Sequence, residues 1–158
     1  MATEPLSVQA LAAVVAALQT ANGSGSYWND LSATGRVQIG APNSQYPGAL
    51  PCVWIVAVQL TPVEWRDLGG RRIALALTLN LFAGADGADG TARMTSILRL
   101  QSDCARALNA DPTLGLSYVM PLTYSVETIE GAAVGYPGCM VGVMSVVIPF
   151  LRDPGDGL

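Results

Sequence analysis

Two long stretches of alternating sequence constrain the fold of this chain more than any other feature. They are residues 71–83 (RRIALALTLNLFA) and 140–151 (MVGVMSVVIPFL), and in both a large apolar residue returns at every second position. The intervening residues are small, apolar or weakly polar, which is typical of strands buried on one face and at least partly covered on the other. We therefore predict that the two stretches are paired strands around which the chain is organised. Neither carries a catalytic motif.

The same periodicities place the remaining elements. An Ala-rich helix is predicted near the N-terminus, with Asn22-Gly23 as its stop and one apolar face made of Leu6, Ala10, Ala13, Val14, Ala17 and Leu18. Alternation predicts a short strand over residues 36–40, a strong one over 52–60 and a long one over 116–128. Pro121 in the last stretch removes one ladder donor, which indicates an edge or bulged strand.

A second helix is predicted from Thr91, which can serve as its cap. Its apolar stripe consists of Met94, Ile97, Leu98, Cys104, Ala105 and Leu108, whereas the charged residues Arg93, Arg99, Asp103 and Arg106 fall mostly elsewhere. The order of elements predicts an α+β fold, with a mainly antiparallel or mixed sheet of about four to five strands and two helices packed on one face. The length of 158 residues fits one domain over 1–158, with about residues 152–158 as a flexible tail.

The charge inventory excludes several classes of function. Charged residues make up 13% of the chain, against roughly 25% in typical soluble domains, so we expect apolar surface that is covered by another chain. The formal net charge of −4 argues against a protein that holds nucleic acid through counterion release. Histidine is absent, which excludes a Ser-His-Asp or Cys-His site, an imidazole metal site and a His-based pH switch within one chain.

The cysteines and the N-terminal sequence indicate where the protein works. Cys52, Cys104 and Cys139 are odd in number, far apart and embedded in apolar sequence, which favours buried thiols and a reducing compartment. The start MATEPLSVQ has no Lys or Arg, so the following LAAVVAAL lacks the basic region of a secretory signal and is too short to span a bilayer. We expect a protein made and used in the cytosol unless something else carries it out.

Two loops contain residues suited to protein contacts. Tyr27 and Trp28 stand in the Gly/Ser-rich loop GSGSYWNDLSATG, where aromatics more often plug the end of a core than form a ligand site. Trp65, Arg66 and Asp67 stand in TPVEWRDLGG, a connection longer than a hairpin needs. Trp and Arg are favoured at protein interfaces, while a loop folded back onto its own sheet is the simpler alternative.

A third loop, GADGADG, includes Gly84, Asp86 and Asp89. It lacks the remaining ligand positions and the closing Glu of a calcium loop, and its glycines do not form a phosphate-binding fingerprint. We interpret it as a solvated loop and expect no metal or cofactor.

An enzyme would have to use carboxylates and arginine alone. The acids closest in sequence are Glu127 with Glu130, and Glu64 with Asp67. Glycosidase-type chemistry needs two carboxyls that face one cleft, and acids three residues apart at strand ends or in loops are usually just solvated. We therefore expect no catalytic residues; a deep pocket lined by such acids would favour a small ligand-binding domain or a carboxylate enzyme instead.

The order of elements and four sequence features resemble the tail terminator and neck-type tail-completion proteins of long-tailed bacteriophages. The features are the YWNDL loop after the first helix, ALPCVWI opening a strand, GGRRIALALTLNLFA before a helix with LRLQSDCARAL, and the closing pattern DPTLGL…LTYSVETIEG…VGVMSVVIPF. The resemblance covers nearly the whole chain. It implies a homo-oligomeric ring, usually a hexamer, that caps the tail tube, ends its polymerisation and joins the tail to the head connector or stopper protein.

The resemblance also implies a place in the virion, at the neck or top of the tail, after assembly in the host cytoplasm. DNA would pass through the ring without specific binding, so we expect acidic positions such as Glu127 and Glu130, or Asp86 and Asp89, to face the channel. Interface residues are expected first at Trp65, Arg66 and Asp67, and then in the loop from Gly84 to Gly90. The alternatives within the same class are another neck, head-completion or tail-tube protein.

Overall fold

The two organising stretches form neighbouring strands, as the alternation predicts. In the computed structural model, β3 (Arg72–Gly84) and β5 (Cys139–Leu151) pair antiparallel along their whole length. The strand β2 (Cys52–Val63) lies along the other edge of β3, also antiparallel, so the predicted hairpin partners are adjacent. The connection between them, residues 64–71, lies outside the described part of the chain.

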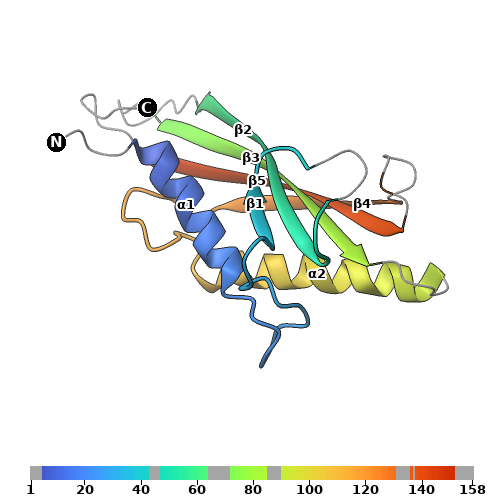
Figure 1. The fold of residues 1–158 in the computed structure, drawn as a ribbon. Coiled ribbons are helices and arrows are strands. Elements are labelled where there is room, and N and C mark those ends of the chain that lie inside the picture. The colour runs from blue at the N-terminus through green and yellow to red at the C-terminus, as the bar shows by residue number, and fades with distance from the viewer. Residues whose placement is uncertain are drawn as a thin grey trace.

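The structure describes residues 5–42, 47–63, 72–84, 90–130, 136 and 138–151. The further elements are α1 (Leu6–Gln19), β1 (Val37–Ile39), α2 (Gly90–Ala110) and β4 (Thr123–Glu130). The five strands form one sheet in the order β1-β2-β3-β5-β4, in which β1 is parallel to β2 and every other pair is antiparallel (Figure 1). A mixed sheet with two helices confirms the predicted α+β fold.

The register assigns the strand residues to two faces, and one of them packs on both helices. Its cross-strand rows are Leu60–Leu75–Ile148, Val58–Leu77–Val146–Tyr124 and Ile55–Leu79–Met144–Val126. Ala10, Val14 and Leu18 of α1 and Ile97, Leu100, Cys104 and Leu108 of α2 join the inner members of these rows in one buried cluster. Burial of an aliphatic side chain of this size stabilises a fold by roughly 1.5–3 kcal/mol, so this helix-covered face is the main core.

Among the described residues, the opposite face has a buried hydrophobic cluster at one end. There Cys52, Phe82 and Val141 form a second small buried cluster, and Phe82 meets the ring of Tyr136 edge to face at 4.9 Å. Trp54 packs on the same cluster and donates its indole N–H to the carbonyl of Pro47 at 2.7 Å. The partial cover predicted for the second face is therefore present.

Three further cross-strand rows of this second face are called the open face below: Gln59–Ala76–Val147–Thr123, Ala57–Thr78–Ser145–Ser125 and Trp54–Asn80–Val143–Glu127. Two more rows, Thr61–Ala74–Pro149 and Val63–Arg72–Leu151, continue the same side of the sheet toward the start of β3. Small and polar residues dominate the three rows of the open face, and neither helix lies over them (Figure 1). The sheet therefore has a leucine-rich covered face and an open face dominated by small and polar residues.

A glycine on β5 permits the close approach of α2. A Cβ at Gly142 would lie 2.7 Å from Nε2 of Gln101 and 3.3 Å from the Ile97 side chain. The Gln101 amide in turn donates to Oγ1 of Thr128 at 2.9 Å and to the carbonyl of Glu127 at 3.1 Å. These bonds tie α2 to β4 across the space that the missing side chain leaves.

The strand predicted over residues 116–128 is wrong in its first part, because β4 begins only at Thr123. Before it, the N–H of Met120 donates to the carbonyl of Pro149 at 2.8 Å, and that of Leu122 to the carbonyl of Pro112 at 3.0 Å. Pro121 has no N–H to give to a ladder. The alternation through 116–122 reflects turn residues that pack on the core, and β4 itself is an edge strand, as Pro121 indicates.

The apolar stripe predicted for α2 is partly wrong. Met94 and Leu98 are exposed, whereas the buried residues are Ile97, Leu100, Gln101, Asp103, Cys104, Ala107 and Leu108. One side of α2 packs on the sheet, and the adjoining side packs on α1 and on the loop that follows α1. The buried residues of α2 therefore extend around the helix in the direction away from β4. Thr91 lies inside the helix, which begins at Gly90, and does not cap it.

Candidate interaction surfaces

A buried carboxylate fastens the loop after α1 to the side of α2. Asp103 has no exposed surface, and its oxygens accept the backbone N–H of Trp28 at 3.0 and 3.1 Å and that of Asn29 at 2.8 Å. The side-chain amide of Asn29 donates a further bond of 2.8 Å. Burial of a carboxylate is costly unless donors surround it, so the loop and Asp103 depend on each other. This set of three residues is called the Asp103 clamp.

The loop is shaped by short-range bonds before it reaches the clamp. The N–H of Leu31, a fully buried residue, donates to the carbonyl of Ala21 at 2.6 Å and closes the loop at its base. The Asp30 carboxylate accepts two hydrogen bonds from Ser32, one from its hydroxyl at 2.6 Å and one from its backbone N–H at 2.9 Å. These bonds lower the pKa of Asp30 below its ordinary value. The backbone of residues 28 and 29 is therefore held from both sides.

The clamp leaves the Trp28 side chain pointing outward. The residue is 63% exposed, and the guanidinium carbon of Arg99 lies 4.4 Å from the centre of its ring, a cation–π arrangement. Trp and Arg are the residue types most often found at interface hot spots, and a side chain fixed in advance loses little entropy when it binds. Trp28 with Arg99 is the described pair of residues best suited to anchor a protein partner.

Its neighbour Tyr27 is placed differently. Tyr27 is half-buried and packs on the main core, with its hydroxyl 3.5 Å from Oγ1 of Thr20. Of the two aromatics predicted together, Tyr27 thus plugs the end of the core and Trp28 faces solvent. The Asp103 clamp holds the backbone of Trp28 and Asn29, whereas Tyr27 precedes it and ends a turn closed by its N–H on the carbonyl of Ser24 at 3.1 Å.

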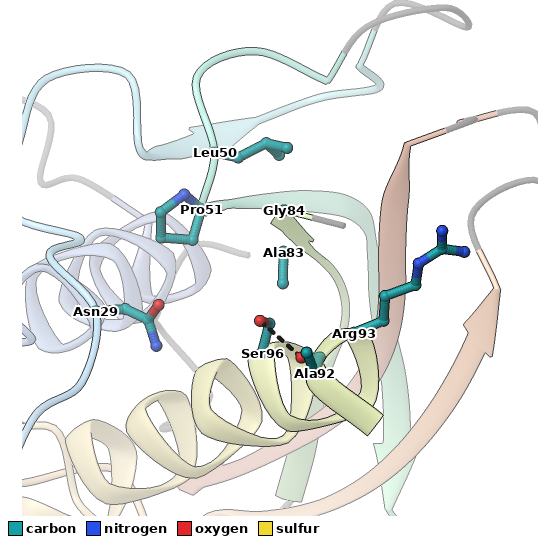
Figure 2. A pocket seen from close by; sticks show the side chains of 8 residues that line it. All are labelled: Asn29, Leu50, Pro51, Ala83, Gly84, Ala92, Arg93 and Ser96. Atoms are coloured by element: carbon teal, nitrogen blue, oxygen red, sulfur yellow. Dashed lines mark hydrogen bonds between the residues drawn. The ribbon is translucent and has the colours of Figure 1, made fainter. Parts of the chain in front are cut away.

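A pocket of about 330 Å³ adjoins the clamp at the N-terminal half of α2 (Figure 2). Its walls come from the loop before β2, the end of β3 and α2, and the lining residues are Asn29, Leu50, Pro51, Ala83, Gly84, Ala92, Arg93 and Ser96. Figure 2 shows Asn29 and Arg93 on opposite sides of it. The Ser96 hydroxyl is engaged with the carbonyl of Ala92 at 3.0 Å. None of the described residues that line this pocket is a carboxylate, so the described part of its wall does not provide the two facing acids that a glycosidase-type site requires.

Arginines are exposed along α2, Arg99 and Arg106 on its outer side and Arg93 in the wall of the pocket. Arg93, Arg99 and Arg106 are all exposed, and the one acid of this helix, Asp103, is buried in the clamp. The chain as a whole has a net charge of −4. A partner that docks on Trp28 therefore meets arginines and no exposed carboxylate of α2.

The acidic positions predicted to face a channel lie on β4. Glu127 is exposed and stands on the open face opposite Val143. Glu130 ends the strand opposite Met140, and its side chain lies outside the described part. Positions three apart in a strand belong to opposite faces, so β4 does not present them as a pair.

Most of the other predicted contact residues fall outside the described ranges. Trp65, Arg66 and Asp67 belong to residues 64–71, and Asp86 and Asp89 to residues 85–89. The same holds for Glu64, for the tail 152–158 and for residues 1–4. Gly84 is described; it ends β3 and lines the pocket beside α2.

The three thiols are buried, and no disulfide joins them, as predicted. Burial raises the pKa of Cys52 to about 11, with a smaller contribution from Cys139 nearby. Burial, followed by the neighbouring Asp103, also raises the pKa of Cys104. The raised pKa values keep Cys52 and Cys104 protonated near neutral pH, and a protonated, buried thiol is not a nucleophile.

Sequence reasoning missed Asp103. Its position in the helical pattern places it beside the arginines, and nothing local shows that its partners come from residues 28 and 29, which lie 75 and 74 positions away. The usable signal was the pair Leu100 and Ala107, which flank Asp103 at helical spacing and mark that side of α2 as buried.

The comparisons with known proteins add no relative. No protein-family model matches the chain, and no curated protein matches it significantly. Neither helix in the described part of the chain is long and apolar enough to cross a membrane. Among the described residues, no group of three or more Cys, Asp or Glu side chains is arranged to hold a metal ion.

Proposed function

We propose that this protein is a virion structural subunit of a long-tailed bacteriophage that forms a ring on the end of the tail tube. The ring, a hexamer by resemblance, ends tube polymerisation and joins the tail to the head connector or stopper protein. In this proposal the subunit works by binding alone, at the top of the tail, after assembly in the host cytoplasm. The element order on which the resemblance rests is the order that the fold has.

The observation that carries the proposal is the contrast between the two sides of the sheet. Across the three rows of the open face Glu127 is the one charged residue, and the rest are small, polar or apolar. By the register, Arg72 belongs to the same side of β3 but stands two rows beyond Ala76, at the start of the strand. A channel that lets DNA slide must not grip phosphates, and a face with a carboxylate and no arginine in these rows repels them weakly. The open face is therefore the side that we assign to the channel, with Glu127 toward the DNA.

The helix side then faces outward and provides contacts. Trp28, fixed by the Asp103 clamp and stacked under Arg99, is an anchor for the tail tube protein or the head connector. The segment with Trp65, Arg66 and Asp67, which lies outside the described residues, carries the same residue types in its sequence. Because a ring uses two different patches on each subunit, surface beyond the monomer core has to be buried, in line with the low charged fraction.

The first experiment is the mass of the purified protein by light scattering after size exclusion, with negative-stain imaging of the same peak. A hexamer-sized species that forms rings and binds one end of purified tail tubes is the expected result. A species that never binds tubes, alone or with connector protein, contradicts the proposal whatever its mass. An enclosed channel lined by arginine in an image of the assembled tail contradicts the orientation of the open face.

Trp28→Ala tests the anchor. We expect ring formation to persist and tube or connector binding to weaken at least tenfold, because a hot-spot truncation costs about 2 kcal/mol or more. Leu98→Ala is the matched control, since Leu98 is an exposed apolar residue of α2 outside the clamp, and it should leave binding unchanged. Trp65→Ala is tested in parallel; unchanged assembly and tail joining would remove that loop from the interface.

A further inference from the structure

The sheet ends in two free edges that suit each other. On one side, β1 pairs only with residues 53–55 of β2, so among the described residues no strand pairs with the outer edge of 57–63. On the other side, β4 pairs with β5 and has no described partner beyond it. The two free rows have similar lengths, residues 57–63 and 123–130. Free strand edges are templates for pairing with another chain.

Both edges carry exposed apolar side chains on the covered face. Val58 on β2 is 48% exposed, Leu60 is 37% exposed, and Val126 on β4 is 43% exposed. Their row partners on β3 and β5, such as Leu77 and Met144, are buried. The main core thus continues to both edges of the sheet and is left open there, as it would be if a further strand completed it.

The backbone groups of these same residues point outward. The carbonyl of Pro149 on β5 accepts from Met120, on the β4 side, and in a strand the direction of the N–H and C=O groups alternates from residue to residue. By the register, Tyr124, Val126 and Thr128 then turn their N–H and C=O groups away from the sheet.

The same alternation, carried across β3 by the register, turns Val58 and Leu60 outward on β2. Two further observations agree. First, Pro62, which has no N–H to lose, falls on an outward position. Second, Val53 and Ile55 form backbone bonds on the β1 side, so odd-numbered residues point outward before the bulge between Ile55 and Ala57; the extra residue in the bulge shifts the alternation, and even-numbered residues point outward after it. Outward backbone groups and exposed apolar side chains therefore belong to the same residues on both edges.

Strand direction and charge fit a head-to-tail contact. Three antiparallel steps lead from β2 through β3 and β5 to β4, so β4 of one copy meets β2 of an equally oriented copy antiparallel. The residues that would exchange hydrogen bonds, such as Val126 on β4 and Val58 on β2, belong to the covered face in both copies. The covered faces of the two copies therefore lie on the same side of the joined sheet, and so do the open faces. Glu127 on β4 would stand beside uncharged β2, which contains no Asp, Glu, Lys or Arg.

We propose that the occupant of each edge is a second copy of this chain, with β4 (123–130) of one copy adding antiparallel to residues 57–63 of β2 in the next. Repeated by rotation, this heterologous contact closes a ring whose inner wall is one continuous sheet. The inference rests on the proposed ring and names the surfaces that form it. Val126, Val58 and Leu60 become buried in the junction.

The test uses two variants with one damaged edge each. Val126→Pro removes an outward N–H from β4, a change that an edge strand tolerates, and Val126→Lys repeats the test with the N–H retained. Val58→Lys places a charge on the β2 edge. Val147→Lys is the matched control, because Val147 is an exposed valine of the open face away from both edges. Circular dichroism and thermal melting verify that each variant is folded.

Light scattering and sedimentation then give the mass of each variant and of mixtures. Wild type and Val147→Lys should form the same oligomer, whereas each edge variant alone should be monomeric. An equimolar mixture of Val126→Pro and Val58→Lys should give a dimer of twice the monomer mass, because one undamaged junction remains between them.

Three outcomes would overturn the inference: a monomeric wild type at all concentrations up to the solubility limit, folded edge variants that keep the wild-type mass, or a β4 variant that dissociates while Val58→Lys does not. The last would mean that β4 pairs with itself across a two-fold axis. Failure of tube binding with the edge results intact would count against the proposed function and leave the junction standing.

Discussion

The two faces of the sheet are built from alternate residues of the same strands and yet differ in almost every property. On the covered face, Leu77 and Leu79 of β3 and Val146 of β5 are buried under both helices. On the open face, their immediate neighbours Thr78 and Ser145 have partial or full exposure and no helix over them. The difference indicates that the covered face supplies most of the stability, so the residues of the open face are less constrained by packing.

The largest expected effect is on the covered face. Leu79→Ala should lower the free energy of unfolding by about 2–5 kcal/mol, because Leu79 is fully buried and its truncation leaves a cavity. Ser145→Ala, on the adjacent strand but the open face, is the control and should change stability by less than about 0.5 kcal/mol. Urea unfolding of both variants measures the difference. Equal destabilisation would mean that the two faces are equally packed.

A smaller effect is expected where the covered face meets the Asp103 clamp. Asp103→Ala should cost about 2 kcal/mol, because the backbone donors of Trp28 and Asn29 lose their acceptor. Asp103→Asn keeps one acceptor oxygen and should cost less. Urea unfolding gives the stability, and acrylamide quenching of tryptophan fluorescence reports the release of the loop. If Asp103→Ala unfolds like wild type with unchanged quenching, the loop is held by its own turns alone.

The smallest effects concern the thiols, which sample both faces. Cys104 lies in the main core, whereas Cys52 and Cys139 lie at the covered end of the second face. We expect the disulfide reagent DTNB to modify Cys139 first and Cys104 last in native protein, and all three at once in denaturant. Peptide mapping by mass spectrometry assigns the order. Early modification of Cys104 would mean that the helix layer opens before the second face does.

The raised thiol pKa also predicts a pH dependence. In the folded protein Cys52 keeps its proton up to about pH 11, whereas in the unfolded chain it ionises near its ordinary pKa of 9.0. Unfolding therefore releases a proton in this window, and stability is lost as the pH rises from about 9 to about 11. Urea unfolding of wild type and Cys52→Ser across this pH range measures the effect. The free energy of unfolding should fall less steeply with pH in Cys52→Ser, because serine does not ionise in this range.

Sequence periodicity predicted the elements well because a strand or helix that is buried on one side has apolar residues at regular spacing in its own sequence. The pairing of residues 71–83 with 140–151 followed from their shared pattern and length, and the structure pairs them. The same method was wrong at 116–122, where turn residues that pack on the core imitate the alternation of a strand. It was also wrong for Met94 and Leu98, because which side of an amphipathic helix is buried depends on what lies beside it.

The candidate surfaces were less predictable than the fold. Trp28 was identified by its residue type. The sequence did not indicate which of Tyr27 and Trp28 is exposed, because both stand in one Gly/Ser-rich loop. The free edges at β2 and β4 depend on the order of strands in the sheet, which no local pattern records.

By itself, the sequence determined the number and type of the elements, the absence of histidine chemistry, the burial of the thiols and the presence of two central strands. These follow from composition and from short-range periodicity. Only the tertiary structure decided that Asp103 is buried, that Trp28 is held outward and that residues 57–63 of β2 and the strand β4 lie at the two edges of the described sheet. The physical reason is that each of these depends on groups brought together from distant parts of the chain, such as residues 28 and 103, whose hydrogen bonds exist only after the core has formed.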